Sequence, residues 1–101
     1  MNWRILSHIS LLLTAISFSS WSNADAAWID VRSAIEHSID NIEGDIRISH
    51  TDIVQEVTSL FPDKSTEIRL YCRSGARAGK AMTALNQAGY TSVSNAGGID
   101  D

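Results

Sequence analysis

The chain contains a single cysteine, Cys72, and the residues that follow it are suited to stabilise a negative charge. Arg73 is its direct neighbour, and a second arginine, Arg77, lies five positions after the cysteine. In cysteine chemistry the thiolate is the nucleophile, and nearby cations favour that charged form. These three residues therefore predict a reactive cysteine whose pKa lies below that of a free thiol.

The segments on either side of Cys72 predict how the chain positions it. Residues 67–72 (EIRLYC) form the strongest candidate strand, and a stripe of small and apolar residues from Ala78 to Ala88 predicts a helix that begins near Arg77 and is closed by Gly89. Ligands of α/β sheets bind at the carboxyl ends of strands, and the N–H groups at a helix N-terminus attract anions. The turn between strand and helix is therefore an expected anion-binding loop; it consists of Ser74, Gly75 and Ala76.

A structural role for Cys72 is the alternative that the residues leave open. A lone cysteine at a strand end is often a small buried hydrophobic residue, and arginines in loops are usually solvated. A buried structural cysteine, however, does not need a glycine-containing turn flanked by two arginines. One cysteine also cannot form a disulfide within the chain, and an unpaired cysteine in an exported protein suggests either intermolecular pairing or a reactive thiol. We favour the reactive thiol.

The remaining segments predict an α/β domain with a small, mainly parallel sheet. Further short strands are expected at residues 28–31, 46–48 and 91–94, with a helical turn at 33–38 and a loop at Gly97 and Gly98. A capping box from Ser49 to Asp52 predicts a helix over residues 50–61, which Pro62 ends. Arg69 interrupts the apolar pattern of its strand, which indicates a partly exposed sheet face.

Composition narrows the classes of function. The 101 residues suit one domain, and 8 Lys and Arg against 12 Asp and Glu give a net charge of −4, which argues against nucleic acid as a partner. His37 and His50 have no second ligand at a convincing metal spacing, and no phosphate-binding or dinucleotide-binding motif is present. Neither a metal nor a cofactor is expected.

The N-terminal segment is typical of a secretory signal peptide. Arg4 precedes an apolar stretch over residues 9–18, and Ala24-Asp25-Ala26 fits a cleavage site. An apolar run of 10 residues is about half of the ~20 that a membrane-spanning helix needs. We therefore expect cleavage after Ala26 and a periplasmic domain, residues 27–101, that acts as a monomer without contact to the membrane.

The loop around Cys72 resembles the active-site loop of rhodanese-type sulfurtransferases, C-R-S-G-x-R, over residues 71–78 (YCRSGARA). Residues 28–32 (WIDVR) resemble the D-V-R strand end of that family, and residues 42–48 and 89–98 resemble its second segment and its G-Y to G-G ending. The resemblance covers nearly all of residues 27–101. The resemblance implies a three-layer α/β/α fold. It is strongest to the exported members of the family that have a single domain.

The resemblance also implies an activity, the transfer of sulfane sulfur from thiosulfate to cyanide or a thiol. Cys72 would take up the outer sulfur as a persulfide, and backbone amides of residues 73–77 would hold its charge. Arg73 would attract thiosulfate, whereas Arg77 would either contact substrate or make a structural tie to the loop or to Asp30. Asp30 and Arg32 would fix neighbouring loops. The substrate-binding residues implied are Arg73, Ser74, Gly75, Ala76 and Arg77.

Two departures from the family pattern concern the surroundings of this loop. Asn41, Glu43, Asp45 and Arg47 stand where the family usually has His, Pro, Ala and Asn. The sequence also ends three residues after Gly98, where relatives generally continue, so we expect a shortened C-terminus and a more open edge of the site.

Other functions remain as alternatives. Phosphatases and arsenate reductases of the Cys-x5-Arg type also use a thiolate in an anion-binding loop, but four residues separate Cys72 from Arg77, a tighter loop that suits one sulfur atom better than phosphate. No aspartate can be assigned as their general acid. A non-catalytic binding module of the same shape is a second alternative. A persulfide carrier with a protein acceptor is a third, and it shares the Cys72 intermediate.

Overall fold

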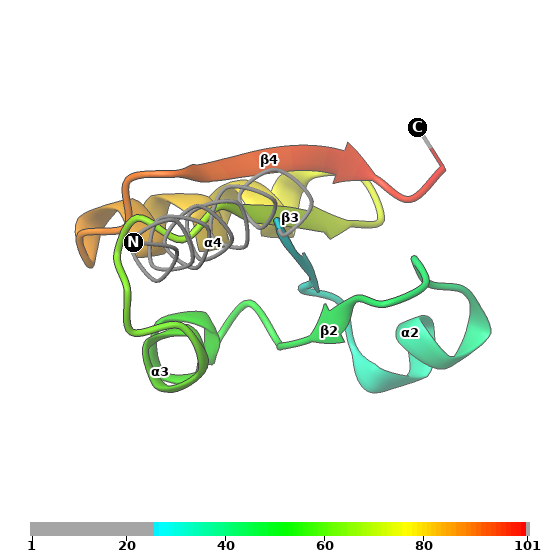
Figure 1. Cartoon of the computed structure of the whole chain (residues 1–101). Coiled ribbons are helices and arrows are strands. Elements are labelled where there is room, and N and C mark those ends of the chain that lie inside the picture. The colour runs from blue at the N-terminus through cyan, green and yellow to red at the C-terminus, as the bar shows by residue number, and fades with distance from the viewer. Residues whose placement is uncertain (1–25, 101) are drawn as a thin grey trace, which may run out of the picture.

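The computed structural model describes residues 26–100, which form one four-stranded sheet and the helices packed on it (Figure 1). The strand order is β2-β1-β3-β4, and each neighbouring pair is parallel. The elements in chain order are β1 (Ala27–Asp30), α2 (Ala34–Ile39), β2 (Ile46–Arg47), α3 (Ile53–Leu60), β3 (Ile68–Cys72), α4 (Ala76–Gln87) and β4 (Val93–Gly98). The predicted α/β class is confirmed.

One face of the sheet carries the hydrophobic core. Ile29 in β1 lies in register with Leu70 in β3, and both side chains are buried. α3 contributes Ile53 and Val57 to the same core, and α4 contributes the small-residue stripe predicted from the sequence, with Ala78, Ala81 and Leu85 buried. Small side chains let α4 pack close to β3 and β4. The two helices therefore cover this face and hold the start of α4 beside the end of β3.

α2 lies at the opposite face, where it contacts the end of β1 through a side chain and buries none of its own residues. Because side chains alternate along a strand, Asp30 and Tyr71, partners in the register of β1 and β3, point to this face. His37 of α2 contacts the Asp30 carboxylate at 2.9 Å. Further along the same face Arg69 is exposed and stacks on Trp28, with its guanidinium 5.4 Å from the ring centre. The prediction of a partly exposed sheet face, made from Arg69, is confirmed.

The observed elements differ from the predicted ones at several boundaries, and the largest differences concern α3 and β4, which lies at 93–98 instead of the predicted 91–94. α3 begins at Ile53, not at residue 50, because Asp52 makes no capping bond and Ser49 instead hydrogen-bonds Thr51. A complete capping box occurs at α2, where Ser33 and Glu36 bond each other's backbone N–H. At the other end of the chain Gly97 and Gly98 belong to β4 rather than to a loop, since parallel pairing with β3 continues to Cys72.

The predicted signal peptide and its cleavage site lie outside the described residues, except for Ala26. Among residues 26–100 no helix has the length and apolar character needed to cross a membrane.

Candidate active site

Cys72 is the last residue of β3, and its sulfur lies at the N-terminus of α4, as the sequence predicted. The backbone N–H of Gly75 donates a hydrogen bond to Sγ at 2.9 Å. The residue is only 1% exposed. A sulfur atom that is buried yet bonded by a backbone amide occupies a site built to hold negative charge.

The pKa of the Cys72 thiol lies below its ordinary value. Burial raises this pKa, but hydrogen bonding from the backbone N–H groups of Ala78, Ser74, Gly75 and Arg77 lowers it by more. Ala78 lies one residue beyond the loop predicted to supply such groups. The balance favours the thiolate, which is the form needed for nucleophilic attack.

Two glycines allow the loop and β4 to approach each other closely. Gly75 adopts φ +95°, a left-handed conformation that side chains disfavour, and it starts α4. A Cβ atom at Gly98 would lie 2.2 Å from the carbonyl oxygen of Arg73, which excludes any larger residue without a backbone shift. The backbone N–H of Ile99 then donates to the carbonyl oxygen of Cys72 at 2.9 Å. The end of β4 thus supports the Cys72 loop from one side.

Arg77 supports the loop from the other side, and its partner is Glu36 rather than Asp30. Both guanidinium Nη atoms donate to the two carboxylate oxygens of Glu36, at 2.8 and 2.9 Å. Of the contacts predicted for Arg77, the tie to Asp30 is not present, and its side chain pairs with Glu36 instead. The bond from Arg77 is the main cause that lowers the pKa of Glu36 to about 2, and Ser33 contributes through the capping box. The ion pair between Arg77 and Glu36 joins α2 to the first turn of α4.

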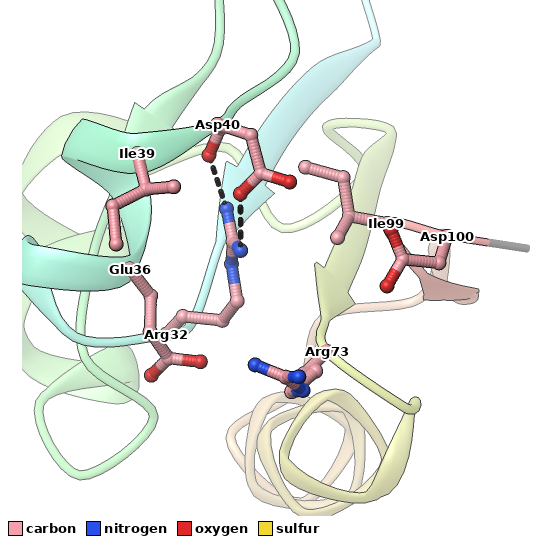
Figure 2. Close-up of a pocket in the computed structure, with 7 residues that line it drawn as sticks. All are labelled: Arg32, Glu36, Ile39, Asp40, Arg73, Ile99 and Asp100. Carbon is pink, nitrogen blue, oxygen red and sulfur yellow. Dashed lines mark hydrogen bonds and ion pairs between the residues drawn. The ribbon is translucent and has the colours of Figure 1, made fainter.

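Arg73 lines an open cleft of about 170 Å³ next to the loop (Figure 2). Among residues 26–100 its side chain has no ion-pair partner, whereas Arg32, Arg69 and Arg77 each pair with a carboxylate. The cleft is lined by Arg32, Glu36, Ile39, Asp40, Arg73, Ile99 and Asp100. Cys72 is not among the residues that line this cleft. The cleft meets the loop through Arg73 and Ile99, and its lining is mixed in charge.

A buried ion pair holds the far wall of this cleft. Asp30 is fully buried, and Arg32 donates to its carboxylate from the backbone N–H at 2.9 Å and from the guanidinium at 2.8 to 3.1 Å. Arg32 also binds the side chain of Asp40 at 3.0 Å and its carbonyl oxygen at 2.6 Å. Burial raises the pKa of Asp30, and its bonds to Arg32 and His37 lower it by more. The predicted role of Asp30 and Arg32 in fixing nearby loops agrees with this geometry.

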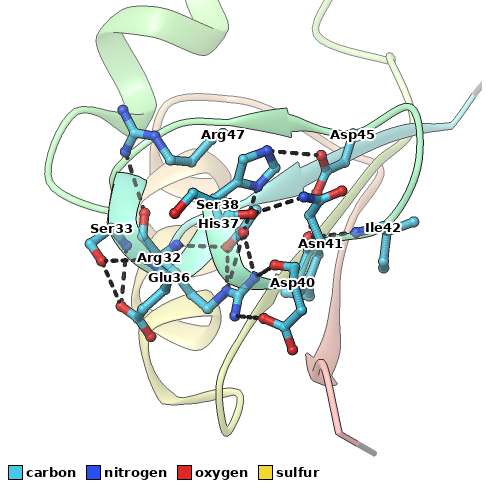
Figure 3. A network of polar contacts seen from close by, with 12 residues as sticks. Arg32, Ser33, Glu36, His37, Ser38, Asp40, Asn41, Ile42, Asp45 and Arg47 are labelled. Atoms are coloured by element: carbon cyan, nitrogen blue, oxygen red, sulfur yellow. Dashed lines mark hydrogen bonds and ion pairs between the residues drawn. The ribbon is translucent and has the colours of Figure 1, made fainter.

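His37 joins two carboxylates that are distant in sequence (Figure 3). Its Nδ1 lies 2.9 Å from Asp30, and its Nε2 lies 3.5 Å from Asp45, whose carboxylate also accepts a hydrogen bond from the hydroxyl of Tyr71. The ligand atoms of Asp30, His37 and Asp45 lie within 4.8 Å of one another, a cluster that sequence spacing missed. Arg32 already occupies Asp30 and would repel a metal ion, so the cluster is suited to linking α2 with the sheet.

Two of the four residues that depart from the family pattern take part in these links. Asp45 contacts His37 and Tyr71, and Arg47 donates to the carbonyl oxygen of Arg32 at 3.3 Å. Sequence reasoning also missed Glu36, although the Ser33 to Glu36 spacing is a recognisable capping box. It missed Asp40 and Asp100 as cleft residues, because no local pattern reports which loops meet in space.

Fold and site together define a parallel α/β domain that presents one cysteine in an amide-lined loop at a strand end. The chain belongs to the rhodanese-like domain family, whose pattern it matches over residues 14–101. Thiosulfate sulfurtransferase PspE of Escherichia coli K12 is 35% identical over 91 residues, which cover 90% of this chain and 88% of that protein. The resemblance inferred from the Cys72 loop is thereby confirmed.

Solved structures show the same fold. A rhodanese with anions from E. coli superposes with a TM-score of 0.73 and 34% identity, covering 76% of this chain and 91% of that one. A Rhodanese_3-like domain from Anabaena gives a TM-score of 0.70 and 26% identity, with 75% and 87% of the two chains covered. A human single-domain sulfurtransferase at 23% identity shares the fold, with a TM-score of 0.65 over 92% of this chain and 86% of its own.

Proposed function

We propose that this protein is a thiosulfate sulfurtransferase that uses Cys72 as its nucleophile. The observation that carries the proposal is the Cys72 sulfur itself, bonded by the N–H of Gly75 at the N-terminus of α4 and shifted toward its thiolate. Membership of the rhodanese-like family and the 35% identity to thiosulfate sulfurtransferase PspE support the same reaction.

The reaction proceeds in two steps, the uptake of the sulfur atom by Cys72 and its transfer to the acceptor. The Cys72 thiolate attacks the outer sulfur of thiosulfate; a new S–S bond forms as the bond to the inner sulfur breaks, and sulfite leaves with that electron pair. Cyanide or a thiolate then attacks the outer sulfur of the persulfide, which gives thiocyanate or a new persulfide and restores the thiolate. This is covalent catalysis with two half-reactions, and no cofactor is needed for either of them.

The residues of the Cys72 loop have two roles: some stabilise the negative charge on sulfur, and one attracts the sulfur donor. Backbone N–H groups of Ala78, Ser74, Gly75 and Arg77 stabilise the charge of the thiolate and then of the persulfide. Ala76 begins the first turn of α4. Arg73 attracts the donor, because its guanidinium lines the cleft and is not neutralised by a carboxylate among residues 26–100. We expect the donor to approach from the Arg73 side of the loop, because Arg73 lines the neighbouring cleft.

Arg77, Asp30 and Arg32 act as supporting residues. Arg77 is held by both oxygens of Glu36, which leaves it poorly placed to bind a substrate anion. Asp30 and Arg32 form a buried pair that fixes the chain between β1 and α2. Their contribution is to keep the loop and the cleft wall in place.

The experiment that tests the activity measures thiocyanate formed from thiosulfate and cyanide by the purified protein. We expect turnover, parallel lines in double-reciprocal plots as expected for two half-reactions, and complete loss in Cys72→Ser. An aryl phosphate is assayed in parallel. Hydrolysis of the phosphate without thiocyanate formation would favour the phosphatase alternative, and inactivity of a folded protein on both would favour a binding module.

We further propose that the chain is exported to the periplasm and functions there as a monomer. The support is the sequence of residues 1–26, with an apolar stretch followed by Ala24-Asp25-Ala26. N-terminal sequencing of protein recovered from a periplasmic fraction should begin at Ala27. An intact Met1 on membrane-bound protein would contradict export by cleavage, and a dimer in size-exclusion chromatography would contradict the monomer.

A further inference from the structure

β4 carries one extra residue where it runs beside the start of α4 and the Cys72 loop (Figure 1). Asn95 of β4 pairs with Leu70 of β3. Three positions further on, Gly98 pairs with Cys72, which lies only two positions after Leu70. Such a β-bulge bends its strand and redirects side chains, and bulges are frequent next to active sites. Gly97, inside the bulge, has φ +91°, a conformation that glycine adopts readily.

The side chain of Asn95 joins this bulge to the Cys72 loop. Its Nδ2 donates a hydrogen bond to the carbonyl oxygen of Gly75 at 3.0 Å, and its Oδ1 accepts one from the backbone N–H of Gly97 at 2.9 Å. An amide side chain has one donor end and one acceptor end, so both bonds form in this orientation only. Asn95 therefore links the end of β4 to the residue that starts α4.

The residue that Asn95 holds is the one that bonds the sulfur. Gly75 donates its N–H to Sγ of Cys72 at 2.9 Å and has φ +95°. A glycine in this conformation is also the residue of the loop with the greatest backbone freedom. Because φ and ψ connect its N–H to its carbonyl group, holding the carbonyl limits how far the N–H can turn away from the sulfur. The N–H of Gly79 bonds the same carbonyl at 2.9 Å.

We propose that Asn95 is a positioning residue for the sulfur chemistry of Cys72, because it holds Gly75 in the conformation that directs its N–H at Sγ. The inference rests on the proposed sulfurtransferase activity and adds to it a residue that acts on the sulfur through Gly75. The Asn95 side chain is exposed, so its removal takes little from the hydrophobic core. Its effect should therefore appear at the sulfur more than in the stability of the fold.

The strength of one hydrogen bond gives the expected size of the effect. A neutral hydrogen bond contributes about fivefold to an equilibrium constant. Gly79 still bonds the Gly75 carbonyl when Asn95 is removed, so we expect part of this amount at the sulfur. The pKa of Cys72 should rise by about half a unit in Asn95→Ala, and kcat/KM for thiosulfate below that pKa should fall about threefold with the thiolate fraction.

The test is a pH titration of the ultraviolet absorbance of the thiolate, with the absorbance of the matching Cys72→Ser protein subtracted. This measurement needs neither a substrate nor access of a reagent to the buried sulfur. Asn95→Ala should have a higher midpoint than wild type. Asn86→Ala is the matched control and should keep the wild-type midpoint, because Asn86 is exposed in α4 and its side chain has no hydrogen-bond partner among residues 26–100.

A second variant separates the two ends of the amide. Asn95→Asp keeps an oxygen for the N–H of Gly97 but has no N–H to donate to Gly75, so its midpoint should rise at least as far as that of Asn95→Ala. Ser94→Asp controls for the added charge, because Ser94 is the exposed neighbour in β4 and its side chain points to the opposite face of the sheet.

The outcomes separate the role of Asn95 from the activity on which it rests. A raised midpoint in Asn95→Ala, with a thermal unfolding temperature close to that of wild type, supports the positioning role. The role is refuted if Asn95→Ala titrates like Asn86→Ala, or if Asn95→Asp shifts no more than Ser94→Asp. If wild type forms no thiocyanate, the sulfurtransferase proposal fails, and the midpoints still decide whether Asn95 acts on the sulfur.

Discussion

Arg77 and Glu36 are 41 positions apart in the sequence, yet their side chains form a two-bond ion pair at 2.8 and 2.9 Å. Glu36 belongs to the capping box of α2, and Arg77 lies in the first turn of α4, where its own N–H faces Cys72. The pair therefore connects the packing of α2 to the environment of the thiolate. A substitution of Glu36 should therefore alter the environment of the Cys72 sulfur.

Glu36→Gln should lower both stability and activity, with a defined dependence on pH. Hydrogen bonding from Arg77 lowers the pKa of Glu36 from 4.5 to about 2, so the stability it contributes is present above pH 4.5 and is lost as the pH falls toward 2. Thermal unfolding should show wild type more stable at neutral pH and the difference vanishing in that acidic window. We expect kcat/KM for thiosulfate to fall by up to about tenfold, since small misplacements of a site are costly.

Glu56→Gln is the control for this variant, because Glu56 is an exposed residue of α3 whose side chain has no partner among residues 26–100. A difference between wild type and Glu36→Gln that persists unchanged through the acidic window would refute the ion-pair explanation.

Gly98→Ala should damage the site, whereas Gly79→Ala should not. The added methyl group at Gly98 would meet the Arg73 carbonyl oxygen at 2.2 Å, so the Cys72 loop must shift. We expect a loss of about 1–3 kcal/mol in unfolding free energy and at least tenfold slower turnover. At Gly79, inside α4, the methyl group meets only Asn95 Nδ2 at 3.5 Å, and alanine should add about 0.5–1 kcal/mol. Equal stability and equal activity of the two variants in urea unfolding and thiocyanate assays would contradict this close approach.

Arg73→Ala should weaken donor binding without weakening the fold. The Arg73 side chain has no ion-pair partner among residues 26–100, so its removal should change unfolding free energy by no more than about 0.5 kcal/mol. Loss of the attracting charge should lower kcat/KM for thiosulfate by about 10- to 100-fold, mainly through KM. Arg69→Ala, which removes a cation paired with Glu67 elsewhere on the sheet, is the control. Unchanged KM in Arg73→Ala would show that another group binds the donor.

Asp30→Asn and Asp40→Asn remove the buried and the exposed partner of the same arginine. Asp30 is fully buried, and its loss leaves the buried Arg32 with the exposed Asp40 as its remaining carboxylate partner, which should cost about 3–5 kcal/mol. Asp40 is 52% exposed, and its loss should cost less than about 1 kcal/mol. Urea unfolding measures both, and similar costs would contradict the central place of Asp30 in the network.

The sequence was most informative where a local pattern reports structure directly. The Cys72 loop, the strand before it and the small-residue stripe of α4 have local signatures, and the structure has all three. The partners of Arg77 and His37 were missed because Glu36, Asp30 and Asp45 meet them only through tertiary packing. The residues that line the cleft were missed for the same reason, since they come from β1, α2 and the end of β4, which meet only in the folded chain.

Incubation with thiosulfate followed by intact mass spectrometry tests the central claim most directly. The purified protein should gain the mass of one sulfur atom, and cyanide should remove that mass and release thiocyanate. Cys72→Ser, which keeps the loop but removes the nucleophile, should gain nothing. Wild-type protein that stays at its original mass after treatment, or a Cys72→Ser variant that gains the same sulfur, would contradict a persulfide at Cys72.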